Sequence, residues 1–169
     1  PDDEAALKAM VIAADIATHG FGVGEVHLRI NAAQIRNAMR PVDGRAISVS
    51  EGVKSPRLLI DRLASRIRTE DPWAINFANL DAETATARRQ LMLATQILKH
   101  IDSDQPIRLL IAECERPLTI MSALYLAHKF GIADMIDISP LFETSYGLEH
   151  GEKVIDQLLQ QQVFIDYVR

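Results

Sequence analysis

Two strand patterns separated by a single helix pattern are the feature that most limits how this chain can fold. The run Ile107–Ala112 is apolar apart from Arg108 and bounded by Pro106 and Glu113, which is typical of a strand buried on both faces of a parallel sheet. Arg116-Pro117 then predicts the start of a helix that ends at Gly131. A short strand is predicted over Met135–Ser139. Parallel strands need a crossover of about a dozen residues or more, so the pattern predicts a βαβ unit.

A third strand is predicted upstream, where apolar and polar residues alternate from Glu25 to Ile30. Period-two alternation places Val26, Leu28 and Ile30 on one face and Glu25, His27 and Arg29 on the other. Asn31 and Gln34 form a variant of the capping box, which predicts a helix to about Arg40. The fold class is therefore expected to be α/β with parallel strands.

The remaining segments are mostly helical in pattern. Helices are predicted over Asp3–Thr18, from Ser55-Pro56 through Ile67, from a cap at Asp81 through Ile101, and from about Gly147 to Gln162, with a loop at 41–54. We expect one segment over residues 1–169, with a loop-rich and helical insertion at about 41–104 between the first and second strands.

Composition excludes several classes of function. The 169 residues carry a net charge of −5 without a dominant Lys/Arg cluster, so we expect no nucleic-acid and no anionic-membrane partner. No apolar run approaches the ~20 residues of a membrane span. Cys114 is the single cysteine, which excludes a disulfide within the chain and a cysteine-based zinc site. A reducing, cytoplasmic location is expected.

The stretch Pro140-Leu-Phe-Glu-Thr144 is followed by Leu148 and, near the end of the next helix, by Leu158-Leu159. Together with the preceding strand and helix, this ~60-residue region is similar to phosphoenolpyruvate carboxylases. A second, shorter match covers His19–Phe21 and Val26–Arg29. The resemblance implies a partial (β/α) TIM-type barrel with parallel strands and long helices, from a divergent member of that family.

The family joins phosphoenolpyruvate and bicarbonate to give oxaloacetate and phosphate, with Mg²⁺ or Mn²⁺. The resemblance implies that Glu143 is a metal ligand, since hard cations prefer carboxylate oxygens and barrel enzymes keep their chemistry at the carboxyl ends of the strands. Without the resemblance, Glu143 would be interpreted as a cap of the following helix or as the partner of a surface cation.

The resemblance also implies that Arg29 binds substrate, because a guanidinium group matches phosphoryl oxygens and stays charged. The alternative is a salt bridge at the strand end, with Glu25 or Glu113. His27 is expected on the same side as Arg29, in a structural rather than catalytic role.

Several positions depart from the family. His27 and Ile30 stand where an acidic residue and a Gln are usual, and Glu113-Cys114-Glu115 replaces small or basic residues. Glu113 and Glu115 are expected to form salt bridges at the rim, with Arg116 or a neighbouring loop, and Cys114 is expected to be buried. Tyr125–Phe130 and the methionines are expected in the packed core. These departures leave open a non-catalytic barrel homologue, another metal-dependent lyase acting on phosphoenolpyruvate or pyruvate, and an interaction domain without a site.

The family's second acidic metal ligand, its catalytic histidine and its substrate-closing loop have no counterpart in this chain. We therefore expect the enzyme activity to belong to a longer parent protein and the isolated 169-residue chain to be inactive. A parallel sheet of three strands also leaves two open edges, which promote association. The chain is accordingly expected to form a homo-oligomer or to cover its edges with its own helices.

Overall fold

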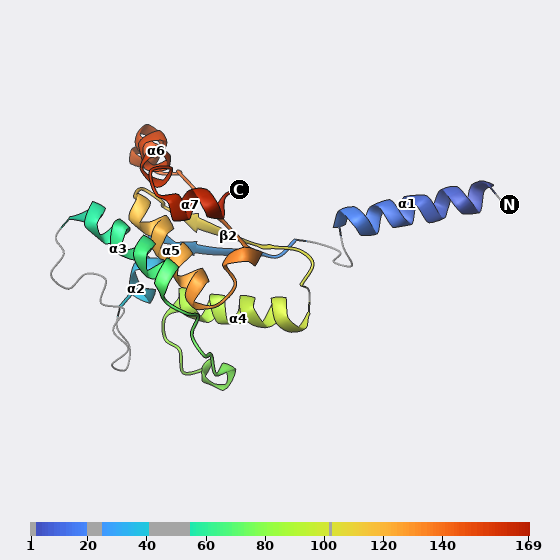
Figure 1. Ribbon diagram of the computed structural model, residues 1–169, viewed down its shortest axis with the longest axis horizontal. Helices are drawn as coiled ribbons and strands as arrows, with labels where there is room; N and C mark the ends of the chain where they lie inside the picture. Colours follow the sequence, from blue (N-terminus) through green and yellow to red (C-terminus); the bar gives the residue numbers. More distant parts are fainter. Residues whose placement is uncertain (1–2, 20–24, 41–54, 102) are drawn as a thin grey trace.

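A computed structural model describes residues 3–19, 25–40, 55–101 and 103–169, and Figure 1 shows the arrangement of their helices and strands. Within these ranges the strands are β1 (His27–Asn31), β2 (Ile107–Ala112) and β3 (Ile136–Pro140). They form one parallel sheet in the order β1-β2-β3. The expected parallel α/β fold is confirmed. The described residues contain a three-stranded sheet and no closed barrel.

The two faces of the sheet differ in their surroundings. Alternate residues such as Ile30, Leu109 and Ile111 are buried among the helices, because α2 (Ala32–Ala38), α4 (Thr86–His100) and α5 (Pro117–Lys129) pack against the strands from that side. The opposite face exposes Arg29 and Arg108, and Leu110 is half-buried. The expectation that β2 is buried on both faces is therefore wrong for the described residues, since helices cover one face only.

Capping chemistry positions the helices where the sequence predicted several of them. The capping box forms at α2 (Ala32–Ala38), where the Asn31 side chain accepts from Gln34 N and the Gln34 side chain accepts from Asn31 N, both at 2.9 Å. Pro56 and Pro117 begin α3 (Pro56–Thr69) and α5 (Pro117–Lys129). Gly131 follows the end of α5 with φ +69°, a left-handed conformation that favours glycine.

The helix expected from Asp81 begins later, as α4 (Thr86–His100) with Ala85 as N-cap. The intervening residues are occupied by a short 3₁₀ turn, η1 (Phe77–Asn79), and by a further turn in which Ala82 N and Glu83 N both donate to Asn79 O at 3.1 Å. The prediction of a cap at Asp81 is therefore wrong. An acidic residue before an apolar stripe is compatible with a turn as well as with a cap.

The last predicted helix corresponds to α6 (Ser145–Leu158) and ends a few residues before Gln162, and a further helix that was not predicted, α7 (Gln162–Tyr167), follows it. The break allows Val163 and Phe164 to be buried and brings α7 against α3. At its end, the Tyr167 hydroxyl donates to Ile136 O at 2.6 Å and accepts from Ile138 N at 2.7 Å. Tyr167 thus forms hydrogen bonds with two backbone groups at the outer edge of β3. Burial raises the pKa of this tyrosine to about 12.

The core is centred on α5, which contacts α2, α3, α4 and α6. Tyr125, Met121 and Leu124 are nearly or fully buried in it, as the sequence predicted, and Cys114 is buried at the end of β2. Of the methionines, Met92 and Met121 lie in the core, whereas Met10 is exposed.

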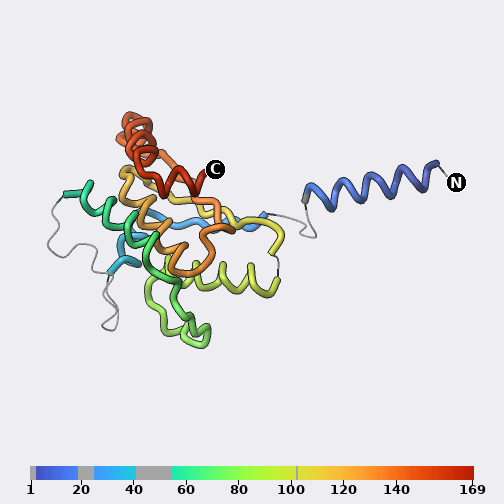
Figure 2. Tube along the Cα trace, in the orientation of Figure 1, coloured from blue at the N-terminus to red at the C-terminus, as the bar shows by residue number. Residues whose placement is uncertain are grey.

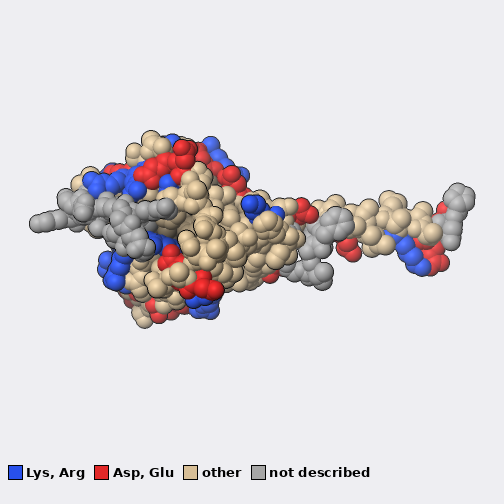
Figure 3. Space-filling view, turned by 90° about the horizontal axis from the view of Figure 1, so that it is seen from below, with Lys and Arg blue, Asp and Glu red and all other residues tan. Residues whose placement is uncertain are grey.

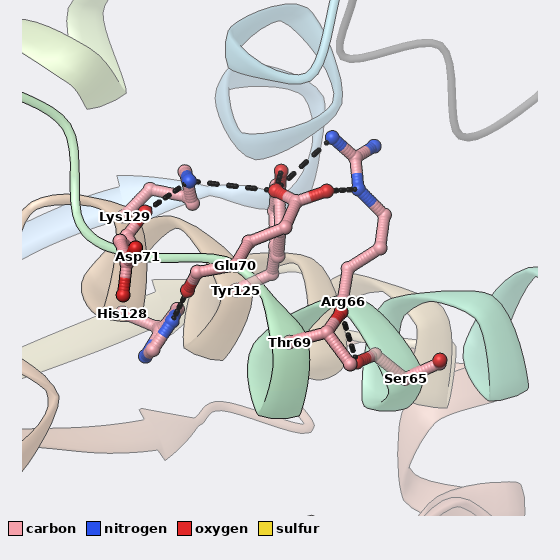
Figure 4. A network of polar contacts seen from close by, with 8 residues as sticks. All are labelled: Ser65, Arg66, Thr69, Glu70, Asp71, Tyr125, His128 and Lys129. Carbon is pink, nitrogen blue, oxygen red and sulfur yellow. Dashed lines mark hydrogen bonds and ion pairs between the residues drawn. The ribbon is translucent and has the colours of Figure 1, made fainter.

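A polar network ties the end of α3 to α5 inside this core (Figure 4). The Glu70 carboxylate accepts from Arg66, from the Tyr125 hydroxyl at 2.9 Å, and forms an ion pair with Lys129 at 3.4 Å. Lys129, 6% exposed, also donates to Asp71 O. Burial alone would raise the pKa of Glu70, but the donors Arg66, Tyr125 and Lys129 outweigh it and lower that pKa below its ordinary value.

A second buried cation anchors the end of α2. Arg88 on α4 donates to Ala38 O at 2.8 Å and to Arg40 O at 2.6 Å. These carbonyls belong to the last turn of α2 and the residues after it, where backbone acceptors lack helical partners. The guanidinium therefore fixes α4 against α2.

Helix α1 (Asp3–His19) lies apart from the rest of the molecule, and the trace in Figure 2 shows it extending away from the sheet and the other helices. From Asp3 to Thr18 its residues are exposed. Among the described residues, no helix combines the length and apolarity needed to cross a membrane.

Candidate functional site

The exposed face of the sheet brings together the two residues that the sequence singled out. Arg29 lies on β1 and Glu143 follows β3, and the Arg29 Nη2 atom is 3.1 Å from Glu143 Oε2 and 3.4 Å from Oε1. Their side chains are 62% and 41% exposed. Residues 114 positions apart in the sequence therefore form an ion pair that solvent can reach.

The positions of the two side chains distinguish the structural alternatives for Glu143 and for Arg29. Glu143 does not cap the following helix, because Thr144 is the N-cap of α6 and its side chain accepts from Gly147 N at 3.0 Å. Arg29 forms its salt bridge with Glu143 rather than with Glu25 or Glu113. Among the described residues, the Glu143 carboxylate is therefore the partner of a surface cation, Arg29.

Glu113 contributes a backbone donor to the same carboxylate. Its N–H lies 3.2 Å from Glu143 Oε1, and its φ of +54° is the left-handed conformation that residues with a side chain rarely adopt. This conformation turns the chain at the end of β2. Such local strain persists only where the surroundings hold it in place, and it is concentrated at functional sites.

The surroundings that hold this turn come from the neighbouring loop after β3. Cys114 N donates to Leu141 O at 3.1 Å, and the Thr144 hydroxyl donates to Glu115 Oε1 at 2.7 Å. A Cβ on Gly147 would lie 3.1 Å from Thr144 Oγ1 and 3.4 Å from Cys114 O, so the two loops and α6 are closely packed. Glu115 contacts the neighbouring loop through this hydrogen bond to Thr144, and among the described residues neither Glu113 nor Glu115 forms the expected salt bridge.

A second polar cluster lies on the exposed face, nearer the amino ends of the strands. Glu25 pairs with His27 at 3.2 Å and with Arg108 at 3.4 Å. His27 is on the same side as Arg29, as expected, because both alternate with buried residues along β1. Its partner is a carboxylate, and among the described residues it contacts no group of the Arg29–Glu143 pair.

The fit of a divalent cation to these residues is partial. The described residues contain no group of three His, Cys, Asp or Glu side chains that could hold a metal ion. An ionised carboxylate offers about four lone-pair positions, so two donor groups leave room on Glu143 for a further ligand. Mg²⁺ is held by one or two carboxylates together with water and substrate oxygens. Glu143 could supply one such ligand and no more.

Two contributors to this region, the Glu113 N–H and the Thr144 cap, were missed by the sequence analysis, as was the Glu70 network between α3 and α5. The Glu113 N–H could not be found, because no pattern in the sequence predicts a left-handed conformation for a glutamate. Thr144 as N-cap, with Gly147 three residues on, could have been found from the preference of Thr for caps. The Glu70 network could have been predicted in part from Tyr125, since a buried tyrosine hydroxyl needs a hydrogen-bond partner.

Cys114 carries no sign of reactivity. Its thiol is buried, and burial raises its pKa to about 11. In comparisons with known proteins, no family model, no curated protein and no solved structure matches this chain.

Proposed function

We propose that this chain is part of the active-site wall of a phosphoenolpyruvate carboxylase-like enzyme, a carboxy-lyase located in the cytoplasm. In the parent protein, Glu143 would ligate Mg²⁺ or Mn²⁺, and Arg29 would bind the phosphate or carboxylate group of phosphoenolpyruvate. The cation would supply charge neutralisation of an enolate oxygen and a phosphate. The sheet would be one part of a TIM-type barrel whose other strands cover the exposed face.

The observation that carries the proposal is the meeting of Arg29 with Glu143. A carboxylate suited to a hard cation and a guanidinium suited to a phosphate lie 3.1 Å apart on the uncovered face, beside a strained turn at Glu113. Ligands of parallel α/β folds bind at the carboxyl ends of the strands, where Glu113 and Glu143 lie.

The test is an assay of the parent polypeptide with phosphoenolpyruvate, bicarbonate and Mg²⁺, with oxaloacetate as the product measured. Glu143→Gln is expected to lower kcat by roughly 10³-fold, since a metal stabilises developing charge by several kcal/mol. Arg29→Gln is expected to lower kcat/KM by about 10- to 100-fold, the value of a charge-assisted hydrogen bond. Glu149→Gln, an exposed change on α6, is the matched control.

Unchanged rates in Glu143→Gln would exclude the metal-ligand role. Release of free pyruvate without carboxylation would identify a different metal-dependent lyase. The isolated 169-residue chain is expected to form no oxaloacetate, because its described residues provide a single carboxylate at this position.

One observation favours a second candidate, a non-catalytic barrel homologue or interaction domain. The Tyr167 hydroxyl forms hydrogen bonds with Ile136 O and Ile138 N at the outer edge of β3, where the next strand of a barrel would pair. If the parent polypeptide binds neither Mn²⁺ nor phosphoenolpyruvate, this candidate replaces the enzyme. Mn²⁺ binding is measured directly by electron paramagnetic resonance.

A further inference from the structure

Exposed ion pairs in this molecule differ in how they are held. Figure 3 shows acidic and basic side chains next to one another along the margins of one face of the molecule. In the Lys8–Glu4 pair on α1, the two side chains are 71% and 75% exposed and meet across one helical turn. In the Arg29–Glu143 pair, the carboxylate also accepts from a backbone donor, the Glu113 N–H, at 3.2 Å. A backbone N–H has a fixed position, so this bond forms only where the chain holds Glu143 in place.

The backbone just before Glu143 is held by β2. Leu141 N donates to Ile111 O at 2.9 Å, and Leu141 O accepts from Cys114 N at 3.1 Å. Leu141 therefore continues the parallel pairing of the two strands past Pro140, the last residue of β3. These bonds fix the position of residue 141, but they do not fix the direction of the side chains that follow it.

The side chain of Phe142 supplies a second anchor, on α6. A Cβ added to Gly151 would lie 3.0 Å from Phe142 Cδ2, 3.1 Å from Cγ and 3.3 Å from Cε2, and these are its three nearest atoms. A Cβ added to Gly147, one turn earlier, would lie 3.4 Å from Phe142 Cα. Both glycines are buried. Because carbon atoms in ordinary contact are about 3.5–4.0 Å apart, the ring lies closer to α6 than a residue with a side chain at 151 would allow.

The presence of glycine at position 151 is explained by this contact. Gly151 lies in the interior of α6, where glycine is less favourable than alanine because it loses more backbone freedom on folding. Among the described residues, Gly131 is the glycine with a positive φ, so the backbone conformation of Gly151 does not require glycine. The close approach of Phe142 does require it.

The two anchors together direct the Glu143 side chain. Leu141 is paired as in a strand, and Thr144 has an extended conformation with φ −93° and ψ 156°. In an extended segment, successive side chains point to opposite sides. With the Phe142 ring on α6, the next side chain therefore points away from α6, toward the exposed face of the sheet where Arg29 lies.

We propose that Phe142 is a positioning residue for the candidate site: through its contact with Gly151, it fixes the Glu143 carboxylate beside Arg29 and the Glu113 N–H. Its significance for catalysis rests on the proposed function, in which Glu143 ligates a cation. Groups that orient a metal ligand from outside the coordination shell contribute about 10- to 100-fold to metal affinity. The position of the carboxylate itself is a property of this chain and is measured separately.

Nuclear magnetic resonance of the 169-residue chain measures that position through the Glu113 amide proton. An amide that donates to a carboxylate resonates downfield of one that does not. Gly151→Ala places a methyl group against the Phe142 ring and is expected to shift the Glu113 resonance upfield, as Glu143→Ala does. In the Glu143→Ala background, Gly151→Ala is expected to leave the resonance unchanged, whereas a direct effect of the displaced ring would persist there. A resonance that stays in place in Gly151→Ala, or that moves equally in both backgrounds, overturns the inference.

A compensating change and a matched control complete this test. Phe142→Leu shortens the side chain that meets the new methyl group, so Phe142→Leu combined with Gly151→Ala is expected to recover part of the downfield position. No recovery in the double variant contradicts the inference. Gln157→Ala, an exposed change on the same helix, is expected to leave the Glu113 resonance unchanged. If circular dichroism shows that Gly151→Ala does not fold, Phe142→Ala removes the same contact and is expected to give the same upfield shift.

Manganese binding to the parent polypeptide separates this inference from the proposed function. Electron paramagnetic resonance is expected to give a Kd for Mn²⁺ about 10-fold higher in Gly151→Ala than in the wild type, with Gln157→Ala unchanged. Equal affinity in Gly151→Ala and the wild type overturns the positioning role and leaves the metal site intact. A wild-type parent that binds no Mn²⁺ excludes the proposed function, and the Glu113 resonance alone then decides the positioning role.

Discussion

Two of the arginine–glutamate pairs in this molecule, Arg66–Glu70 and Arg29–Glu143, have surroundings that give them different roles. Arg66–Glu70 lies between α3 and α5, where the Tyr125 hydroxyl and the buried Lys129 bond to the same carboxylate. Arg29–Glu143 lies on the open face of the sheet, and its carboxylate has one further donor, the Glu113 N–H. The comparison shows that the chemistry of a pair does not decide its role. The number of fixed partners and the access of solvent decide it.

The largest effect on stability is expected for Glu70→Ala. This change leaves the Lys129 ammonium, which is 6% exposed, without its carboxylate partner and removes the acceptor of the Tyr125 hydroxyl. Glu70 is 30% exposed and Lys129 keeps Asp71 O as an acceptor, so the cost is about 2–3 kcal/mol, which corresponds to a melting temperature lower by roughly 5–10 °C. Thermal unfolding of this variant beside Glu149→Ala measures it. A loss no larger than that of the control would mean that the network contributes nothing.

Tyr125→Phe tests the same network from the α5 side. Removing the hydroxyl deletes the 2.9 Å bond to Glu70 and is expected to cost about 1–2 kcal/mol. Burial and the Glu70 bond raise the pKa of Tyr125 above its ordinary value of 10.0. Its stabilising contribution is therefore complete below pH 10 and is lost as the pH rises toward the folded-state pKa. Urea titrations at pH 7 and pH 10.5 should show a smaller alkaline loss in Tyr125→Phe than in the wild type.

Acid should weaken the partly buried Arg66–Glu70 pair in a defined direction. The donors around Glu70 lower its pKa below the ordinary value of 4.5, so its contribution is complete above that value and is lost as the pH falls through the folded-state pKa. Glu70→Gln is therefore expected to flatten the dependence of unfolding free energy on pH below about pH 4.5. An identical acid dependence in both proteins would assign the loss to other carboxyl groups.

The smallest effect is expected for the exposed pair. Arg29→Ala and Glu143→Ala should each change the unfolding free energy by less than about 1 kcal/mol, because solvent-exposed ion pairs contribute little. A double-mutant cycle gives the coupling energy, which should be smaller than that of a matching Arg66–Glu70 cycle. A larger coupling at Arg29–Glu143 would reverse the comparison and indicate a structural role for the exposed pair.

Most element positions followed from local rules in the sequence, and the failures have local causes too. The Asn31–Gln34 capping box formed as predicted, and Pro117 and Gly131 bounded α5. The cap expected at Asp81 failed, because Asn79 O takes up the following N–H groups in a turn. Helix α7 also escaped prediction, because its position depends on burial of Phe164 and on contact with α3, which is distant in the sequence.

The sequence alone determined the parallel α/β class, the alternation of β1, the placement of Arg29 on the polar side of β1 and the placement of Glu143 after β3. These properties depend on period, caps and turns within a few residues. Only the tertiary structure decided that Arg29 pairs with Glu143, that Glu113 adopts a left-handed conformation to donate to it, and that Glu70 is held by three donors. Such contacts join segments between about 30 and 114 residues apart. Their geometry is set by packing of α5 against its neighbours, which no local pattern specifies.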